Sequence, residues 1–302
     1  MPFRVVIACW LCWLAAPISI LSQEIDIRLN YLATWTGADS LGEFRNPSGL
    51  AVDPSGCVYL ADTGNERIIR LDSSGKTVNW VGGYGWNEGQ FNRPVAVTAP
   101  NGLDVFVADF MNRRVQRFDK DLHFLSTLEP ADDWPEELRF ESPGDVRLSD
   151  QGELFCLDAQ NRRVLKFDVL GKLQTAFGGY DAGDGRLVRP ERICLSDDKI
   201  FVSDPKRIAV FDMHGNHLAD WGSGILSEPV GMVAIGRMLC VADRANRTIF
   251  FFDDGVQVNS IWVLPALFRE PVDVGASGDL LYVLDRVLGI QIIRWAKRPA
   301  DR

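Results

Sequence analysis

The strongest constraint on this chain of 302 residues is a motif that recurs along it. Each copy begins at a proline, and 14 or 15 residues later a short apolar run ends in aspartate. Successive prolines are 39 to 49 residues apart, and they are Pro47, Pro94, Pro143, Pro190, Pro229 and Pro271. A regular period of this length predicts a repeat architecture, in which each copy buries its apolar faces against its neighbours.

Turn residues divide each copy into short runs rich in Val, Ile, Leu, Phe and Tyr, as in Thr77–Val81 and Leu173–Phe177. We count four such runs per copy, and runs of this length and composition predict β-strands. Four strands repeated six times predict an all-β fold, a six-bladed β-propeller with four antiparallel strands per blade. The expected units lie near 44–90, 91–139, 140–186, 187–225, 226–267 and 268–302.

The two ends of the repeat region complement each other. The sixth copy stops after its third strand, whereas an extra strand is expected before the first copy, near 29–36. The ending LATWTG of that strand is similar to the fourth-strand ending LQTAFGG at 173–179. We therefore expect the N-terminal strand to complete the last blade and close the ring.

The residues also carry a family resemblance. PSGLAVDPSGCVYLADTGNERIIRLDSSG at 47–75 resembles an NHL repeat, and VGGYGWNEGQFNRP at 81–94 resembles the linker between such repeats. The resemblance covers about residues 29–295 and is strongest in the first three copies. It implies the same six-bladed propeller.

The N-terminus predicts export. Residues 5–21 form an uncharged and mostly apolar run after Arg4, which indicates a signal peptide over residues 1–22, and an uncleaved anchor is the alternative. The mature protein, 23–302, is then expected to be periplasmic or extracellular, with no further membrane span. The formal net charge is −9, and an acidic protein is a poor partner for nucleic acid.

The cysteines show no metal or redox spacing. Cys9 and Cys12 fall in the expected leader, and the other four, Cys57, Cys156, Cys194 and Cys240, are far apart without a Cys-x-x-Cys pair. This excludes a local zinc or dithiol motif. Each of the four lies inside an expected strand, where we predict a buried small side chain.

The recurring turn Asp-x-x-Asn-x-Arg is expected to be scaffold because it is repeated from blade to blade. Asp62, Asp109, Asp158 and Asp243 should accept backbone N–H groups, with the following asparagines in left-handed conformation. Arg67, Arg114, Arg163 and Arg247 should pair with these carboxylates. The alternative is a rim of arginines that binds RNA, as the resemblance implies for some NHL propellers, and the acidic charge argues against it.

Four charged residues interrupt otherwise small or neutral positions on the innermost strands. They are Asp145, Arg147, Arg192 and Asp273. One interpretation is that the arginines pair with the aspartates and plug the central channel, because buried charges require partners. The other is a polar pocket at a channel mouth for an anionic or polyhydroxylated ligand.

Aromatic residues on the loops between blades are candidates for partner binding. They are Tyr84, Trp86, Trp134 and Tyr180, and they share one face with the Asp-x-x-Asn turns. Exposed aromatics on rigid loops often anchor protein partners, although they also cap blade edges.

Enzyme templates fit less well. The resemblance implies two enzyme classes for comparison. They are amidating lyases, which use a histidine-ligated zinc, and lactonase-like propellers, which use calcium. His123, His214 and His217 all lie in turns away from the channel, so no zinc site is expected. The preferred function is a non-catalytic scaffold that binds a protein or peptide and needs no cofactor. The alternative is a calcium-dependent, lactonase-like hydrolase or lyase with its site at the channel mouth.

Overall fold

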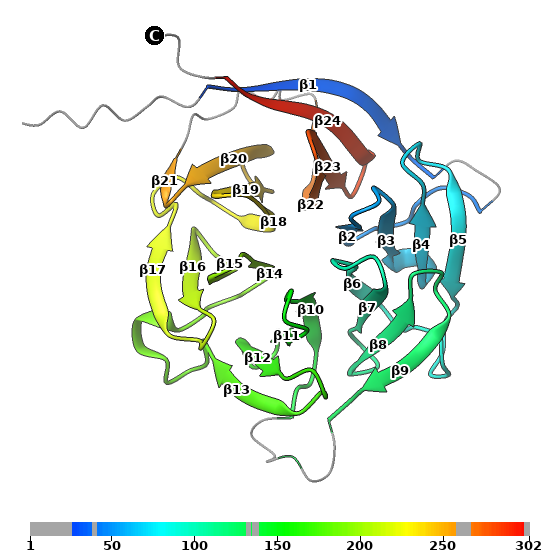
Figure 1. The fold of residues 1–302 in the computed structure, drawn as a ribbon, viewed down its shortest axis with the longest axis horizontal. Coiled ribbons are helices and arrows are strands. Elements are labelled where there is room, and N and C mark those ends of the chain that lie inside the picture. Colours follow the sequence, from blue (N-terminus) through cyan, green and yellow to red (C-terminus); the bar gives the residue numbers. More distant parts are fainter. Residues whose placement is uncertain (1–25, 38–40, 131–133, 135–138, 258–266, 299–302) are drawn as a thin grey trace, which may run out of the picture.

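The computed structural model describes residues 26–37, 41–130, 134, 139–257 and 267–298. These residues form six four-stranded antiparallel sheets arranged as blades around a central channel (Figure 1). The expected all-β, six-bladed propeller is confirmed. The expected signal peptide lies outside the described residues.

Each of the first five blades is built from four consecutive strands, ordered from the channel outwards. Blade 1 contains β2 (Gly49–Val52), β3 (Val58–Asp62), β4 (Arg67–Leu71) and β5 (Thr77–Gly82). Blade 2 contains β6 (Pro94–Thr98), β7 (Asp104–Asp109), β8 (Arg114–Asp119) and β9 (Phe124–Leu128). Blade 3 contains β10 (Pro143–Leu148), β11 (Leu154–Asp158), β12 (Arg163–Phe167) and β13 (Leu173–Phe177). Blade 4 contains β14 (Arg192–Leu195), β15 (Lys199–Asp204), β16 (Arg207–Asp212) and β17 (His217–Trp221). Blade 5 contains β18 (Pro229–Ile235), β19 (Met238–Asp243), β20 (Thr248–Asp253) and β21 (Val256–Gln257).

Blade 6 closes the ring with strands from both ends of the chain. It contains β22 (Pro271–Ser277), β23 (Leu280–Asp285), β24 (Gly289–Arg298) and, as its outermost strand, β1 (Asp26–Trp35). β1 pairs antiparallel with β24, from Asp26 opposite Arg298 to Trp35 opposite Ile290. The expected closure is confirmed, and the strand begins three residues earlier than expected, at Asp26 rather than residue 29.

The core is divided among the blade interfaces. Each apolar cluster draws its side chains from the facing sheets of two neighbouring blades, as where Tyr59 of blade 1 meets Phe91 and Phe118 of blade 2. The next cluster around the ring joins Leu60 of blade 1 to Tyr282 of blade 6. A blade thus buries both faces only because it has two neighbours, which explains why the repeat must close.

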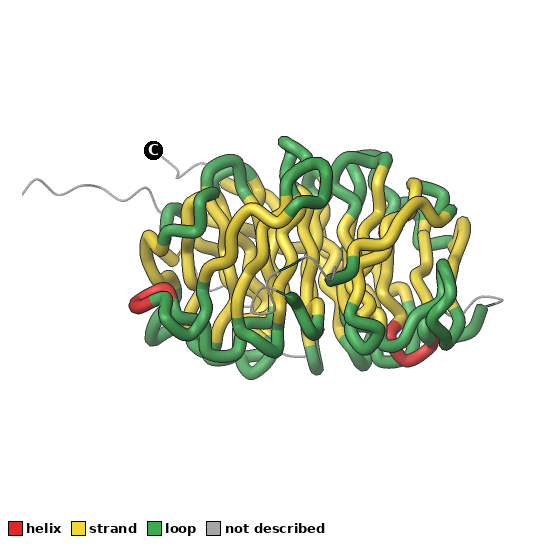
Figure 2. Tube along the Cα trace, turned by 90° about the horizontal axis from the view of Figure 1, so that it is seen from below, coloured by secondary structure: helices red, strands yellow, loops and turns green. Residues whose placement is uncertain are grey.

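The two flat faces of the ring differ in their connections (Figure 2). The loop face is formed by the linkers between blades and the turns between second and third strands, and it carries the 3-10 turns η1 (Thr63–Asn65) and η3 (Gly183–Gly185). The turn face is formed by the turns joining first to second and third to fourth strands. On the turn face, aspartates such as Asp72 and Asp212 accept the N–H groups two and four residues ahead.

The described cysteines are free thiols. Cys156, Cys194 and Cys240 are buried in β11, β14 and β19, and burial raises the pKa of each, that of Cys194 to about 12. Cys57 was expected in a strand, but it precedes β3 in a turn and is half-buried. The strand starts one residue later because Asp53 holds the turn by accepting the Cys57 N–H.

Candidate functional site

The linker between blades 1 and 2 is a rigid loop on the loop face. Arg114, buried at the start of β8, donates to the carbonyls of Trp86, Asn87 and Gln90 at 2.7 to 3.0 Å. The same guanidinium is fixed by Asp109, with Nε to Oδ2 at 2.9 Å. One buried arginine thus replaces the hydrogen bonds that strand pairing would give this loop.

Neighbouring side chains complete the support of this linker. Asn112 donates to the carbonyl of Gly85, and Gln116 both donates to Gln90 and accepts from the Gly89 N–H. Gly83 and Gly85 also bond across to Phe91, whose side chain is buried. The linker backbone is therefore held by hydrogen bonds between its own two ends and by side chains of blade 2.

Two large aromatic side chains project from this fixed backbone. Tyr84 is 71% exposed and Trp86 is 64% exposed. Met111, in the adjacent turn of blade 2, is also exposed and bonds through its N–H to Asn92 O. Exposed apolar groups on an ordered loop are typical of binding anchors, since little conformational entropy is lost when a partner covers them.

The other two aromatic candidates have different surroundings. Tyr180, in the linker between blades 3 and 4, is 78% exposed, and Arg186 lies over its ring at 4.5 Å. Trp134 is half-buried and packs against Phe140 and Phe167, with ring centroids at 6.2 and 5.5 Å. Trp134 therefore belongs to the packing between blades 2 and 3. Its use by a partner stays a prediction.

The aspartate of the repeated turn is a scaffold residue. Asp62 is fully buried, accepts the Arg45 N–H and pairs with Arg67, with Nε to Oδ2 at 2.7 Å. Asp109 binds the Asn92 N–H in the same way, and burial raises the pKa of Asp109 against the opposing effect of these donors. For Asp62 and Asp109 the backbone donors come from the preceding linker rather than from the turn, whereas Asp243 accepts the Asn246 N–H of its own turn as predicted, together with two linker N–H groups.

Two details of this turn were predicted wrongly. The left-handed residue follows the asparagine and is not the asparagine: it is Glu66, Arg113, Arg162 or Arg247. Arg247 therefore occupies the middle position of its turn, and the position of the pairing arginine is held by Thr248, opposite Asp243. In blade 5 the nearby Arg244 pairs instead with Glu191 and Glu228.

The two channel aspartates are buried latches between blades. Asp145 of blade 3 accepts the N–H of Ile193 in blade 4 at 2.7 Å. Asp273 of blade 6 accepts the N–H of Leu50 in blade 1 at 2.8 Å, which adds an inner closure to the outer pairing of β1. Burial raises the pKa of Asp273, and Arg192 and Arg147 oppose the shift.

The two channel arginines span several blades. Arg147 donates to the carbonyls of Ile193 and Val97, and its Nη2 lies 3.3 Å from Asp145 Oδ2. Arg192 donates to Gly144 O and, across the channel, to Ser48 O at 2.5 Å. The structure thus brings all four predicted residues together with most of their polar atoms in use. Arg192 Nε is a buried donor without a partner among the described residues. Ligand binding there stays a prediction.

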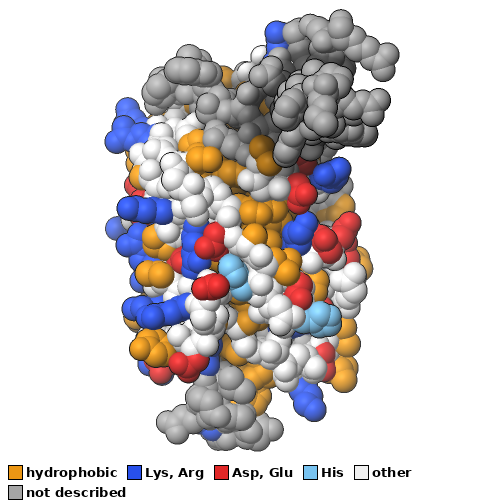
Figure 3. All heavy atoms as spheres, turned by 90° about the vertical axis from the view of Figure 1, so that its left-hand side faces the viewer, with side chains coloured by type: hydrophobic (Ala, Val, Ile, Leu, Met, Phe, Trp, Pro, Cys, Tyr) orange, Lys and Arg blue, Asp and Glu red, His pale blue; other side chains and the backbone are white. Residues whose placement is uncertain are grey.

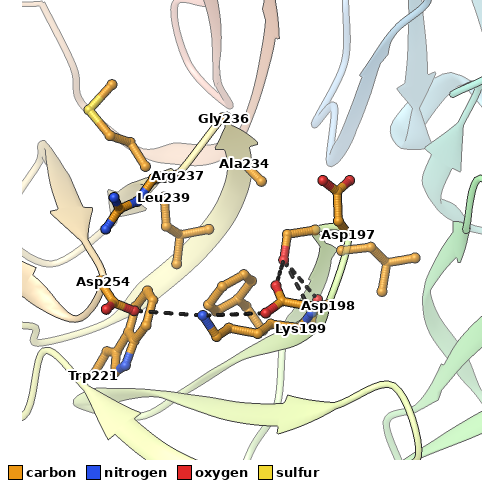
Figure 4. A pocket seen from close by; sticks show the side chains of 13 residues that line it. Asp197, Asp198, Lys199, Trp221, Ala234, Gly236, Arg237, Leu239 and Asp254 are labelled. Carbon is orange, nitrogen blue, oxygen red and sulfur yellow. Dashed lines mark hydrogen bonds and ion pairs between the residues drawn. The ribbon is translucent and has the colours of Figure 1, made fainter.

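Three hollows lie on the described surface, and sequence reasoning offered only the one at a channel mouth, as an alternative. A small one of about 190 Å³ lies at the turn-face mouth of the channel, with Arg147 in its wall. One of about 520 Å³ lies on the loop face and is lined by Arg162, Val188, Arg189 and Pro205. The largest of the three, about 610 Å³, lies between blades 4 and 5 on the turn face (Figure 4). The two larger hollows are formed by residues of neighbouring units, so no single stretch of sequence could signal them.

The histidines lie away from the channel. His123 pairs with Asp119 in the turn before β9, and His217 pairs with Asp220 on β17. Within the described ranges, no group of three or more His, Cys, Asp or Glu side chains could hold a metal ion. In those ranges, too, no helix has the length and apolar character needed to cross a membrane.

The six four-stranded sheets, with linkers fixed by the repeated turn, define a six-bladed β-propeller that carries an NHL repeat in its first blade. The NHL repeat family matches residues 44–71. "NHL repeat-containing protein 3" of Homo sapiens is 35% identical over 123 residues, which are 39% of this chain and 34% of the human protein. "Protein brain tumor" of Drosophila melanogaster is 28% identical over 126 residues, 39% of this chain and 12% of the fly protein. The chain thus spans only a minor part of either relative's length.

Solved propellers share the fold over most of the chain. Virginiamycin B lyase from Staphylococcus aureus superposes with a TM-score of 0.58 and 14% identity, covering 91% of this chain and 89% of the lyase. At this identity the likeness shows the fold alone, because propellers support many unrelated functions.

Proposed function

We propose that this protein is a non-catalytic platform that binds a protein or peptide on its loop face. The observation that carries the proposal is the linker 83–93, where Arg114 fixes the backbone while Tyr84 and Trp86 remain exposed. A purely structural role of this linker would not require two large aromatic side chains to face solvent. Buried aromatic anchors dominate the energy of protein interfaces.

The loop face of blades 3 to 5 indicates the chemistry of the partner. The hollow of about 520 Å³ lies on the loop face of blades 3 and 4, with Arg162 and Arg189 in its wall. Arg162, Lys206 and Arg247 have no carboxylate partner among the described residues. In Figure 3, which views this side of the ring, basic side chains gather along the left-hand edge. These features suit a partner segment with carboxylates next to an apolar anchor.

We expect the partner to be a protein rather than a nucleic acid, and we expect binding to occur outside the cytoplasm. The net charge of −9 and the expected export both argue against nucleic acid, since phosphate binding requires a clear excess of positive charge. Five of the residues that could form a basic rim are already paired or held: Arg67, Arg114, Arg163, Arg207 and Arg244.

The test is a capture experiment followed by titration. The purified protein serves as bait in an extract of the source cells, and the partner is then purified and titrated by calorimetry. We expect the Tyr84→Ala/Trp86→Ala variant to bind at least about ten-fold more weakly, because hot-spot aromatics are worth about 2 kcal/mol or more. Trp134 stays unchanged because it packs against Phe140 and Phe167.

The matched control removes exposed apolar groups from the opposite face. Val169 and Leu170 lie in the turn between β12 and β13 and are both exposed. The Val169→Ala/Leu170→Ala variant should bind the partner as the wild type does. Equal binding by the Tyr84/Trp86 variant, with its fold intact by circular dichroism, would contradict the proposal.

A further inference from the structure

The hollow of about 610 Å³ between blades 4 and 5 opens on the turn face, opposite the surface proposed for protein binding. Its walls come from the first turn of blade 4, the first turn of blade 5 and the last turn of blade 5, with Asp198, Arg237 and Asp254 among them. Its volume is within the range of small-molecule sites. Figure 4 shows the side chains that line it.

Lys199 lines this hollow and is held there only by two long ion pairs. Its Nζ lies 3.8 Å from Asp198 and 3.6 Å from Asp254, beyond hydrogen-bond distance in both cases. In Figure 4 the lysine extends between the two carboxylates. Its side chain is only 28% exposed, and its ammonium makes no hydrogen bond to the described residues. The ammonium therefore keeps N–H donors that none of the described residues uses in a hydrogen bond, although both carboxylates attract it.

An apolar wall lies beside these charges. Trp221 and Phe201 line the hollow and pack on each other with centroids 5.0 Å apart at 50°. Gly255 leaves room for the indole, because a Cβ there would lie 2.8 Å from Trp221 Nε1. The aromatic wall is thus fixed by packing before any ligand arrives.

The charges around the hollow select for a neutral ligand. Asp197, Asp198 and Asp254 oppose Lys199 and Arg237, so both signs are present with a small negative excess. An anion meets three carboxylates, and a cation meets the ammonium. A neutral molecule with several hydroxyl groups can donate to the carboxylates, accept from Lys199 and place its C–H surface against Trp221.

We propose that this hollow is a binding site for a neutral carbohydrate. Lys199 would donate to a hydroxyl, Asp254 and Asp198 would accept from neighbouring hydroxyls, and the Trp221 wall would cover a sugar ring. The proposal is independent of protein binding on the loop face, because the residues lie on the other side of the ring. Either proposal can fail without the other.

The test begins with the purified protein on an array of neutral and anionic mono- and oligosaccharides. The strongest neutral binder is then titrated by calorimetry against wild type and Lys199→Met, which keeps the length of the side chain. We expect about ten-fold weaker binding by Lys199→Met, because a hydrogen bond to a charged donor is worth about 1.5 kcal/mol or more. The matched control is Lys172→Met, an exposed lysine in a blade 3 turn of the same face, which should bind as the wild type does.

A second variant guards against a folding defect. Asp254 is exposed on a turn, so Asp254→Asn should fold normally and should also weaken binding. The proposal is overturned when no neutral sugar binds to the wild type, when anionic sugars bind better than neutral ones, or when Lys199→Met and Asp254→Asn both retain full affinity.

Discussion

The central channel and the hollow between blades 4 and 5 both contain aspartates beside basic side chains, but they use these groups in different ways. In the channel, Asp145 and Asp273 each accept a backbone N–H of the next blade, and Arg147 donates to two carbonyls. In the hollow, Lys199 makes no hydrogen bond to the described residues. Charged residues whose polar atoms are taken up by hydrogen bonds are therefore weak evidence for a ligand, whereas an ammonium held only by ion pairs of 3.6 and 3.8 Å is stronger evidence.

The largest expected effect is the loss of a channel latch. Asp273→Ala removes a carboxylate that faces Arg192 and Arg147, and it leaves the buried Leu50 N–H without an acceptor. We therefore expect a loss of about 4 kcal/mol in the free energy of unfolding. Asp254→Ala in the hollow should cost less than about 0.5 kcal/mol, because that carboxylate is exposed. Urea denaturation measures both. Similar losses in the two variants would erase the contrast between the regions.

Arg114→Ala should have the next largest effect. It leaves Asp109 buried without its cation and frees three linker carbonyls, for an expected loss of about 3 kcal/mol. Amide hydrogen exchange should accelerate at Gly85 and Gln90, whose N–H groups bond within the linker. The neighbouring Arg113 is exposed, and its side chain has no hydrogen-bond or ion-pair partner among the described residues, so Arg113→Ala should change neither quantity appreciably. Unchanged exchange in Arg114→Ala would show that the linker is held by other contacts.

A smaller, pH-dependent effect is expected at the rim. The hydrogen bond from Arg244 lowers the pKa of Glu228 below its ordinary value. A carboxyl whose pKa is lower in the folded state stabilises the protein above its unfolded pKa, and this stabilisation is lost as the pH falls through the folded pKa. Glu228→Gln should therefore cost up to about 1 kcal/mol at pH 7 and nothing near pH 3, as measured by urea denaturation at both values. A cost that does not change with pH would place the effect in packing instead.

Calcium should have no effect on the channel. The carboxylate oxygens of Asp145 and Asp273 already bind backbone N–H groups and face arginines. Adding about 5 mM calcium or about 5 mM EDTA should therefore leave the melting temperature of the protein unchanged. A rise of several degrees with calcium that is lost in Asp273→Asn would instead favour the lactonase-like alternative.

The propeller itself was predictable because its determinants are local and repeated. The spacing of Pro47 and Asp62, copied along the chain, sets strand lengths and turns in every blade, and the missing fourth strand of the last copy pointed to β1. Errors arose where one residue decides a turn. The left-handed conformation belongs to Arg113 rather than Asn112, because the asparagine side chain is used to hold Gly85 and Asp109.

Sequence by itself determined the number of blades, the closure of the ring and the positions of the four channel charges, because these follow from periodicity and from departures from it. Only the tertiary structure decided which polar groups are satisfied. Asp273 binds Leu50 N–H across 223 residues of sequence, and Arg192 reaches Ser48 O across 144. The closed ring brings such partners together, so their hydrogen bonds cannot be read from any one repeat. The same holds for the hollow lined by Lys199, because neighbouring blades form it.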